Sequence, residues 1–186
     1  PVKIKRPHLL PLSPVYGIVT WIRNKFFDLG ILKSERFEIP VIAIGNLNVG
    51  GTGKTPHTIW VLSLISTKIS TAVVSRGYGR KTQGYILANS SSSGEEIGDE
   101  PKEILTRFPN IQLAVAEKRV EGISNLLALK DSPKAIILDD AFQHRHVKAG
   151  LNILLSTYDE IFTEDVMLPG GNLREGKSGY KRADII

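Results

Sequence analysis

A glycine-rich octapeptide at 48–55 constrains the fold of this chain more than any other part of its sequence. It reads Asn-Val-Gly-Gly-Thr-Gly-Lys-Thr, follows an apolar run at 40–45 and precedes a segment with the pattern of a helix. In the order strand, turn and helix, the pattern G-x-x-x-x-G-K-[ST] surrounds a phosphate with backbone N–H groups, and the helix N-terminus adds partial positive charge. The predicted nucleotide-binding residues are Asn48, Val49, Gly50, Gly51, Thr52, Gly53, Lys54 and Thr55.

Asn48 stands where this pattern has its first glycine. Asparagine tolerates a positive φ better than most non-glycine residues, so the turn is compatible with it. Lys54 is expected to reach the β- and γ-phosphates, and Thr55 is expected to bind Mg²⁺. Because a strand precedes it and a helix follows it, the octapeptide favours a nucleotide site over a glycine-rich turn that binds nothing.

The composition fits a globular protein with an anionic partner. The 186 residues suffice for one domain with a substantial core, and 41% of them are hydrophobic. The absence of cysteine excludes disulfides and cysteine metal sites, and it agrees with a reducing cytosol. No apolar run reaches the roughly 18 residues of a membrane span. The net charge of +5 and the pI of about 9.4 favour a nucleotide, a nucleic acid or an acidic membrane as partner.

Residues 1–33 form a basic segment whose pattern predicts an amphipathic helix over 15–29. Ser13 is the predicted N-cap, Pro14 the first helical residue and Gly30 the stop signal. Such a helix can lie in a membrane interface, or it can pack its apolar face on its own domain. That face is made of Val15, Ile18, Val19, Ile22, Phe26 and Leu29, and it is widened by Tyr16, Trp21 and Phe27.

Residues 34–186 alternate between strand-like and helix-like patterns. Nearly all-apolar strands separated by helices predict a three-layer α/β/α domain of the P-loop NTPase type, with a mainly parallel sheet. Ligands bind such sheets beyond the carboxyl ends of the strands. The predicted strands are 41–44, 71–75, 111–115, 135–138 and 151–155, and the predicted helices are 54–68, 100–108 and 118–129.

Two adjacent acids follow the apolar run at 135–138. Four apolar residues ending in an acid are typical of a Walker B strand, whose acid holds Mg²⁺ on the phosphates directly or through water. Side chains of neighbouring residues point to opposite faces if the strand continues. The metal role is therefore assigned to Asp139 first and to Asp140 second.

Several further polar residues lie in the segments that follow the predicted strands. Asp99 is interpreted either as a helix N-cap or as the carboxylate that accepts a proton from the acceptor hydroxyl. His144 is interpreted as a phosphate or substrate contact, or as a surface imidazole. The arginines that are candidates for binding phosphate, each with a surface ion pair as its alternative, are Arg76, Arg80, Arg119 and Arg174.

Six motifs together resemble the tetraacyldisaccharide 4′-kinases of lipid A biosynthesis, from Pro11 to Ile186. The family lacks the first P-loop glycine, and Asn48 agrees with that pattern. Ala141 departs from the pattern, because a glycine is expected at this position. The apolar end of the chain and the missing initial Met suggest part of a longer protein. The motifs are 11–17 (PLSPVYG), 45–56 (GNLNVGGTGKTP), 75–80 (SRGYGR), 98–101 (GDEP), 138–144 (LDDAFQH) and 168–175 (LPGGNLRE).

The resemblance implies transfer of the γ-phosphoryl group of ATP to the 4′-hydroxyl of an acylated glucosamine disaccharide 1-phosphate. It implies that Lys54 binds phosphate, that Thr55 and Asp139 serve Mg²⁺, and that Asp99 is the base. It also implies that their partners in the site are Arg119, His144, Arg174 and Glu175.

The same resemblance bears on the location of the protein and on its further domains. A lipid substrate favours the interfacial role for the helix at 15–29, which would place the protein on the cytoplasmic face of the bacterial inner membrane as a peripheral protein. The family chain also continues into a second, smaller domain, which carries a histidine that pairs with the catalytic aspartate.

Two other classes of protein are alternatives to the kinase. The first class is a P-loop GTPase or ATPase switch. A GTPase would read guanine through [NT]-K-x-D, and this sequence contains no such element. A basic nucleic-acid-binding NTPase would explain the high pI, but the basic residues are scattered and form no recognisable module. We therefore expect no nucleic-acid partner.

Overall fold

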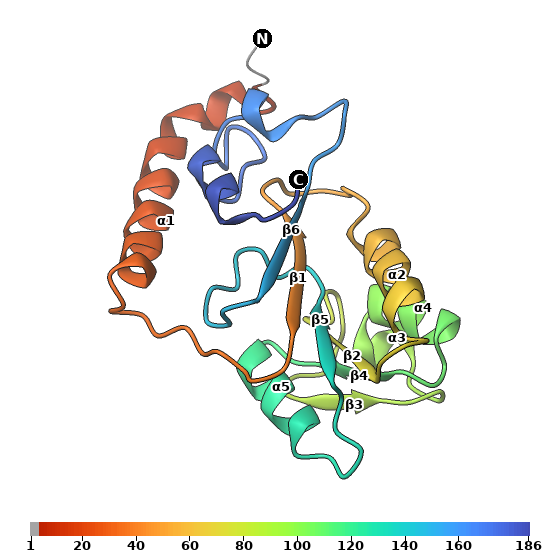
Figure 1. The fold of residues 1–186 in the computed structure, drawn as a ribbon. Helices are drawn as coiled ribbons and strands as arrows, with labels where there is room; N and C mark the ends of the chain where they lie inside the picture. Colours follow the sequence, from red (N-terminus) through yellow and green to blue (C-terminus); the bar gives the residue numbers. More distant parts are fainter. Residues whose placement is uncertain (1–3) are drawn as a thin grey trace.

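Six strands form one sheet in the order β3-β4-β2-β5-β1-β6, and helices lie on both of its faces (Figure 1). The computed structural model describes residues 4–186. All neighbouring strands are parallel except β3 and β4, and Val41 of β1 pairs with Ile136 of β5. The strands are β1 (Val41–Asn46), β2 (Thr71–Ser75), β3 (Ile86–Ala88), β4 (Gln112–Val115), β5 (Ala135–Leu138) and β6 (Leu151–Leu155).

Alternating strand residues fill two separate cores, one on each face of the sheet. Val73 packs with α2 (Lys54–Ile65) and α4 (Asp99–Arg107), whereas Val74 packs with α5 (Arg119–Leu127). Strands that are buried on both faces are apolar almost throughout, which is why the sequence shows continuous apolar runs. The predicted three-layer fold is confirmed. The short helix α3 (Gly94–Ile97) and the antiparallel strand β3 were not predicted.

The long helix α1 (Ser13–Asp28) runs along the outside of the molecule beside the C-terminal segment (Figure 1). The 3₁₀ helix η1 (Pro7–Leu12) precedes it, so Ser13 is not the predicted N-cap. The Ser13 hydroxyl instead donates to the Met167 carbonyl at 2.9 Å and accepts the Gly170 N–H at 3.0 Å. Gly30 adopts a φ of +73° just after the helix, as its predicted role as a stop signal requires.

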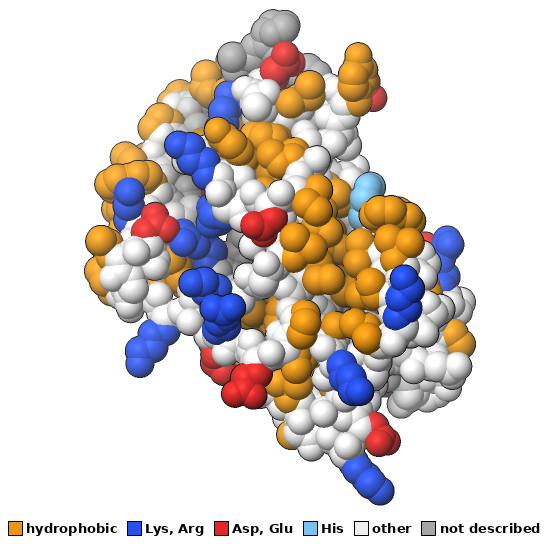
Figure 2. All heavy atoms as spheres, viewed as in Figure 1, with side chains coloured by type: hydrophobic (Ala, Val, Ile, Leu, Met, Phe, Trp, Pro, Cys, Tyr) orange, Lys and Arg blue, Asp and Glu red, His pale blue; other side chains and the backbone are white. Residues whose placement is uncertain are grey.

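The apolar stripe of α1, defined as Val15, Ile18, Val19, Ile22, Phe26 and Leu29, faces away from the protein. Val19 is 61% exposed and Leu29 is 72% exposed, and hydrophobic side chains follow the outer side of α1 in Figure 2. The alternative in which this stripe packs on its own domain is therefore not observed among residues 4–186. Phe27, predicted to widen the stripe, is buried between the guanidinium groups of Arg23 and Arg145, 5.2 and 5.1 Å from its ring centroid.

Irregular segments pack between α1 and the sheet. They include the 3₁₀ helices η2 (Phe162–Glu164) and η3 (Lys177–Arg182). A third core holds them against the end of β1. No helix within residues 4–186 combines the length and apolar character that a bilayer span needs. The third core consists of Leu47, Phe142, Leu154, Phe162 and Leu173.

Candidate active site at the carboxyl edge of the sheet

The glycine-rich loop connects β1 directly to α2, as the sequence predicts. Gly53 has a φ of +76°, which places the first turn of α2 at Lys54. The Asn46 amide donates to the Thr52 hydroxyl at 2.8 Å, and the Lys54 Nζ donates to the Gly50 carbonyl at 3.4 Å. The loop thus curls around the N-terminus of a helix, where N–H groups without helical partners are available to an anion.

Asn48 serves the loop through its side chain and not through a positive φ. Among the described residues, Asp140 is the only non-glycine residue with a positive φ, at +46°. The Asn48 amide donates to the buried Asp165 carboxylate at 3.0 Å, and the neighbouring Val49 N–H donates to the Asn172 carbonyl at 2.7 Å. These two bonds fasten the start of the loop to the segment at 165–172, a constraint that no local pattern reveals.

Asp140 is the acid that faces the P-loop lysine. Its Oδ1 lies 3.9 Å from the Lys54 Nζ, and the Arg174 Nη1 donates to its two oxygens at 3.1 and 3.2 Å. The Lys54 side chain is only 8% exposed, so this electrostatic contact is poorly screened by water. Asp140 is the second residue beyond β5 and adopts its positive φ there, and its carboxylate lies within 3.9 Å of the Lys54 Nζ in this turn.

Asp139 lies behind Asp140 and is fully buried. It accepts the Thr58 hydroxyl of α2 at 3.0 Å and the Ser75 hydroxyl of β2 at 3.4 Å. Burial raises the pKa of the Asp139 carboxyl, whereas the Thr58 hydrogen bond lowers it. A cation bound nearby would favour its ionised form.

Carboxylates and hydroxyls around the P-loop suit Mg²⁺. Within residues 4–186 no group of three or more acids and histidines is arranged to hold a metal ion. Mg²⁺ is usually bound by one or two carboxylates together with waters and nucleotide phosphates. The assignment of Asp139, Asp140 and the Thr55 hydroxyl to such a smaller set of oxygen ligands stays a prediction.

A cleft of about 580 Å³ opens beside these acids. Arg119 lines it but is 2% exposed, because its Nη1 and Nη2 donate to the carbonyls of Ala116 and Asp139 at 2.7 and 3.2 Å. Its Nε has no hydrogen-bond partner, and burial lowers its pKa to about 10, so it stays charged at neutral pH. Arg119 therefore supports the turn that carries the two acids.

His144 is neutral near pH 7. Its Nε2 accepts the Arg119 backbone N–H at 3.3 Å, and burial together with the positive charge of Arg119 lowers its pKa to about 4. The predicted contact of His144 with phosphate or substrate stays a prediction. In this arrangement its ring nitrogen receives a hydrogen bond and carries no charge.

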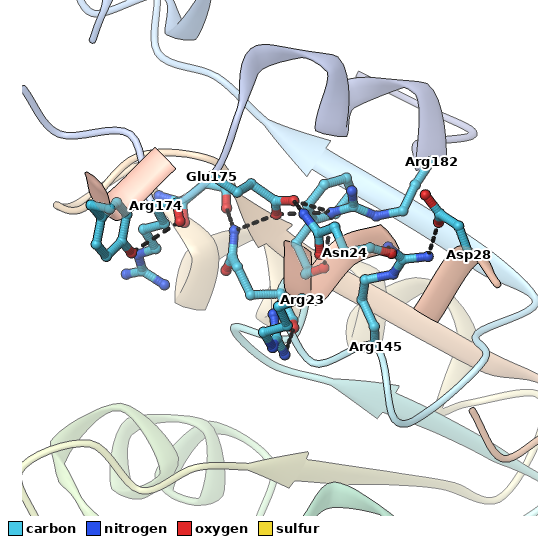
Figure 3. Close-up of polar contacts among 11 residues, drawn as sticks. Arg23, Asn24, Asp28, Arg145, Arg174, Glu175 and Arg182 are labelled. Carbon is cyan, nitrogen blue, oxygen red and sulfur yellow. Dashed lines mark hydrogen bonds and ion pairs between the residues drawn. The ribbon is translucent and has the colours of Figure 1, made fainter. Parts of the chain in front are cut away.

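Glu175 is 3% exposed and receives hydrogen bonds from three parts of the chain (Figure 3). The Arg182 Nη2 donates to the two Glu175 oxygens at 2.8 and 2.9 Å. The Asn24 amide also donates to this carboxylate, at 2.9 Å, and so does the Gln143 amide, at 3.2 Å. The Gln143 amide also donates to the Asn46 carbonyl at the end of β1, at 2.7 Å. The buried charge thus connects α1, η3 and the loop after β5.

Asp99 and Glu100 occupy the first turn of α4. Gly98 is the N-cap, so the predicted capping role of Asp99 is wrong. The Asp99 side chain is exposed and does not line the cleft, whereas that of Glu100 does. Burial, with the nearby charge of Asp139, raises the pKa of the Glu100 carboxyl. The sequence pattern Gly-Asp-Glu-Pro drew attention to this turn but did not indicate which acid faces inward.

The two arginines that follow β2 have different surroundings. Arg76 lines the cleft, and no hydrogen bond or ion pair of its side chain is found among the described residues. Arg80 pairs with Glu117 and donates to the Gly84 carbonyl at 2.6 Å. The ion-pair interpretation is therefore confirmed for Arg80, and Arg76 remains a candidate for binding phosphate.

Comparisons with known proteins agree with this geometry. The model of the tetraacyldisaccharide-1-P 4′-kinase family matches residues 5–186. The tetraacyldisaccharide 4′-kinase of Flavobacterium psychrophilum is 56% identical over 97% of this chain and 53% of its own length. That of Bacteroides thetaiotaomicron is 51% identical over 96% of this chain and 47% of its own length. The chain spans about half the length of these curated relatives.

A solved structure shows the same fold. LpxK from Aquifex aeolicus, described as an "apo" form in complex with ATP, is similar with a TM-score of 0.88 and 39% sequence identity. The match covers 95% of this chain and 56% of that one.

Proposed function

The chain belongs to the tetraacyldisaccharide-1-P 4′-kinase family, and we propose that its P-loop edge transfers the γ-phosphoryl group of ATP to the 4′-hydroxyl of a tetraacyldisaccharide 1-phosphate. One observation above all supports this proposal. Lys54, Asp140 and Arg174 form a continuous charged row at the P-loop, and Asp140 and Arg174 also line the cleft of about 580 Å³. Phosphoryl transfer depends mainly on such positioning and charge stabilisation.

Each member of this row has a separate task. Lys54 neutralises charge on the β- and γ-phosphates, and the P-loop N–H groups orient them. The Arg174 guanidinium donates to both oxygens of the Asp140 carboxylate. These bonds fix the acid beside Lys54 before a nucleotide binds. Mg²⁺, held by Thr55 and by Asp139 or Asp140, would supply charge neutralisation across the phosphates.

Removing the predicted metal ligands should change the response to Mg²⁺. Thr55→Ala and Asp139→Ala should each raise the Mg²⁺ concentration for half-maximal activity, since each loses an oxygen that binds or orients the ion. The measurement is a Mg²⁺ titration of kinase activity, with Asp131→Ala, in the loop before β5, as the matched control. If Asp139→Ala behaves as wild type while Asp140→Ala shifts the titration, Asp140 is the principal ligand.

The surface around α1 suits an acylated acceptor. An apolar hollow of about 410 Å³ lies between α1 and the segment at 165–177, with Leu10, Pro14 and Met167 in its walls. The exposed stripe of α1 is a second apolar surface and would insert into a membrane interface. These features support an acyl-chain substrate and a peripheral location on the cytoplasmic face of the bacterial inner membrane.

Polar substitutions in the stripe should weaken membrane binding without unfolding the protein. Changing Ile18, Ile22 and Phe26 together to Ser removes apolar area worth about 1.5–3 kcal/mol per large side chain if each becomes fully buried. Flotation with liposomes should decrease strongly. The melting temperature should barely change, since these side chains are 40–58% exposed and Ser and Ile have similar helix propensities.

The control for this experiment lies on the same helix. Phe27→Ala empties a buried position, so it should lower the melting temperature and leave the stripe intact. A large loss of thermal stability in the triple Ser variant, with unchanged flotation, would show that the stripe packs against protein.

The proposed reaction is tested with the natural full-length protein. We expect ATP-dependent transfer of phosphate to the 4′-hydroxyl of a tetraacyldisaccharide 1-phosphate. The measurement is the mass of the product and the position of its new phosphate. Transfer to water alone, or strict preference for GTP with no lipid product, would support the switch-type alternative and overturn the kinase.

A further inference from the structure

The polar side of α1 makes direct contact with the loops that carry the site. We propose that α1 is a positioning element for the chemical step, in addition to any role at the membrane. This inference rests on the proposed function, because it concerns the same P-loop edge. We define the inward face of α1 as Tyr16, Arg23 and Asn24, which lie on a different side of the helix from the exposed apolar stripe.

One route of contacts runs from α1 to the P-loop lysine. The Tyr16 hydroxyl donates to the Arg174 carbonyl at 3.0 Å. The Arg174 guanidinium binds the two oxygens of Asp140, and Asp140 lies 3.9 Å from the Lys54 Nζ. A shift of α1 along this route would therefore displace the carboxylate that faces the phosphate site.

A second route reaches the same edge through Glu175 (Figure 3). The Asn24 amide and the Gln143 amide donate to Glu175, and Gln143 also binds the Asn46 carbonyl just before the P-loop. The Arg23 guanidinium donates to the Gln143 carbonyl at 2.9 Å, so α1 holds this residue both directly and through Glu175. Loss of the Asn24 donor would leave the buried Glu175 carboxylate with one bond fewer and free it to shift together with Gln143.

The contacts also run in the opposite direction, from the loop to α1. The Arg145 Nη1 donates to the Asn24 carbonyl at 2.9 Å, and its Nη2 pairs with Asp28 at 2.7 Å. Arg145 thus bonds the loop after β5 to the last five residues of α1.

Asn24 is the informative residue to change, because it belongs to the inward face without lining the cleft. Asn24→Leu keeps the approximate shape but cannot donate to Glu175. With acceptor presented in detergent micelles, we expect kcat to fall about tenfold or more, since small displacements of reacting groups are costly in rate. The KM for ATP should stay within about twofold and liposome flotation should not change. Asn125→Leu, on the exposed face of α5, is the matched control and should leave kcat unaltered.

Tyr16→Phe is the second variant, in case Asn24→Leu fails to fold. It removes a single hydroxyl and its bond to the Arg174 carbonyl, and we expect kcat to fall about threefold in micelles. Normal kcat in Tyr16→Phe and in folded Asn24→Leu would overturn the positioning role and leave α1 as an anchor only. If either variant shows lowered flotation together with a normal kcat in micelles, the positioning role of α1 is likewise overturned. An inactive wild-type protein would instead refute the proposed function.

Discussion

Lys54→Ala is expected to reduce turnover by at least about 10²-fold while the fold remains intact. Loss of one preorganised charged or hydrogen-bonding group that acts on the transition state costs several kcal/mol. Lys54 is the cation that the loop holds at the phosphate position, beside Asp140. The substitution should not disturb Asp140 itself, because Arg174 binds both of its oxygens. Alanine also has the highest helix propensity, which suits the first turn of α2.

The measurement is kcat with saturating ATP, alongside a thermal melt of each variant. Lys68→Ala, an exposed lysine just after α2, provides a matched control with the same change of charge. Retention of more than about a tenth of wild-type activity in Lys54→Ala would mean that the P-loop lysine does not stabilise the transition state. The nucleotide site would then have to be sought elsewhere.

The layers of this fold could be predicted from the sequence, because parallel strands buried on both faces give continuous apolar runs. The strand at 71–75 and the octapeptide before α2 were both placed correctly. The strand β3 was missed, since three residues of an antiparallel edge strand carry too short a pattern. The sequence shows that Asn48 replaces the first P-loop glycine. Its bond to Asp165 could not be predicted, because the two residues lie far apart in the chain.

The inward face of α1 could not be predicted for a physical reason. A helical apolar pattern marks the buried side in most globular proteins, and the pattern of α1 by itself gave no role to Arg23 or Asn24. Here the polar side is turned inward, because the buried Glu175 and the backbone carbonyls of the site loops need donors. The sequence shows which side chains share a face, but it does not show whether protein or membrane covers that face.

The last prediction concerns the base that accepts the proton of the 4′-hydroxyl. Phosphoryl transfer has a loose transition state, so the base mainly orients the nucleophile and accepts its proton late. The resemblance assigns this role to Asp99. The structure fixes its turn closely, because a Cβ on Gly98 would lie 2.9 Å from the Tyr78 carbonyl oxygen. The Asp99 carboxylate rests against Gly94, where a Cβ would lie 2.8 Å from its Oδ1.

Asp99→Asn is expected to lower kcat by about 10²–10⁴-fold with little change in ATP affinity, since asparagine keeps the shape but cannot accept the proton. Asp131→Asn, an exposed site in the loop before β5, is the matched control. Glu100 is the physical competitor, because it lines the cleft and burial raises its pKa toward that of a useful base. If Glu100→Gln abolishes turnover while Asp99→Asn keeps normal kcat, the proton goes to Glu100. If Asp99→Asn mainly weakens ATP affinity, Asp99 is a nucleotide contact and the base lies elsewhere.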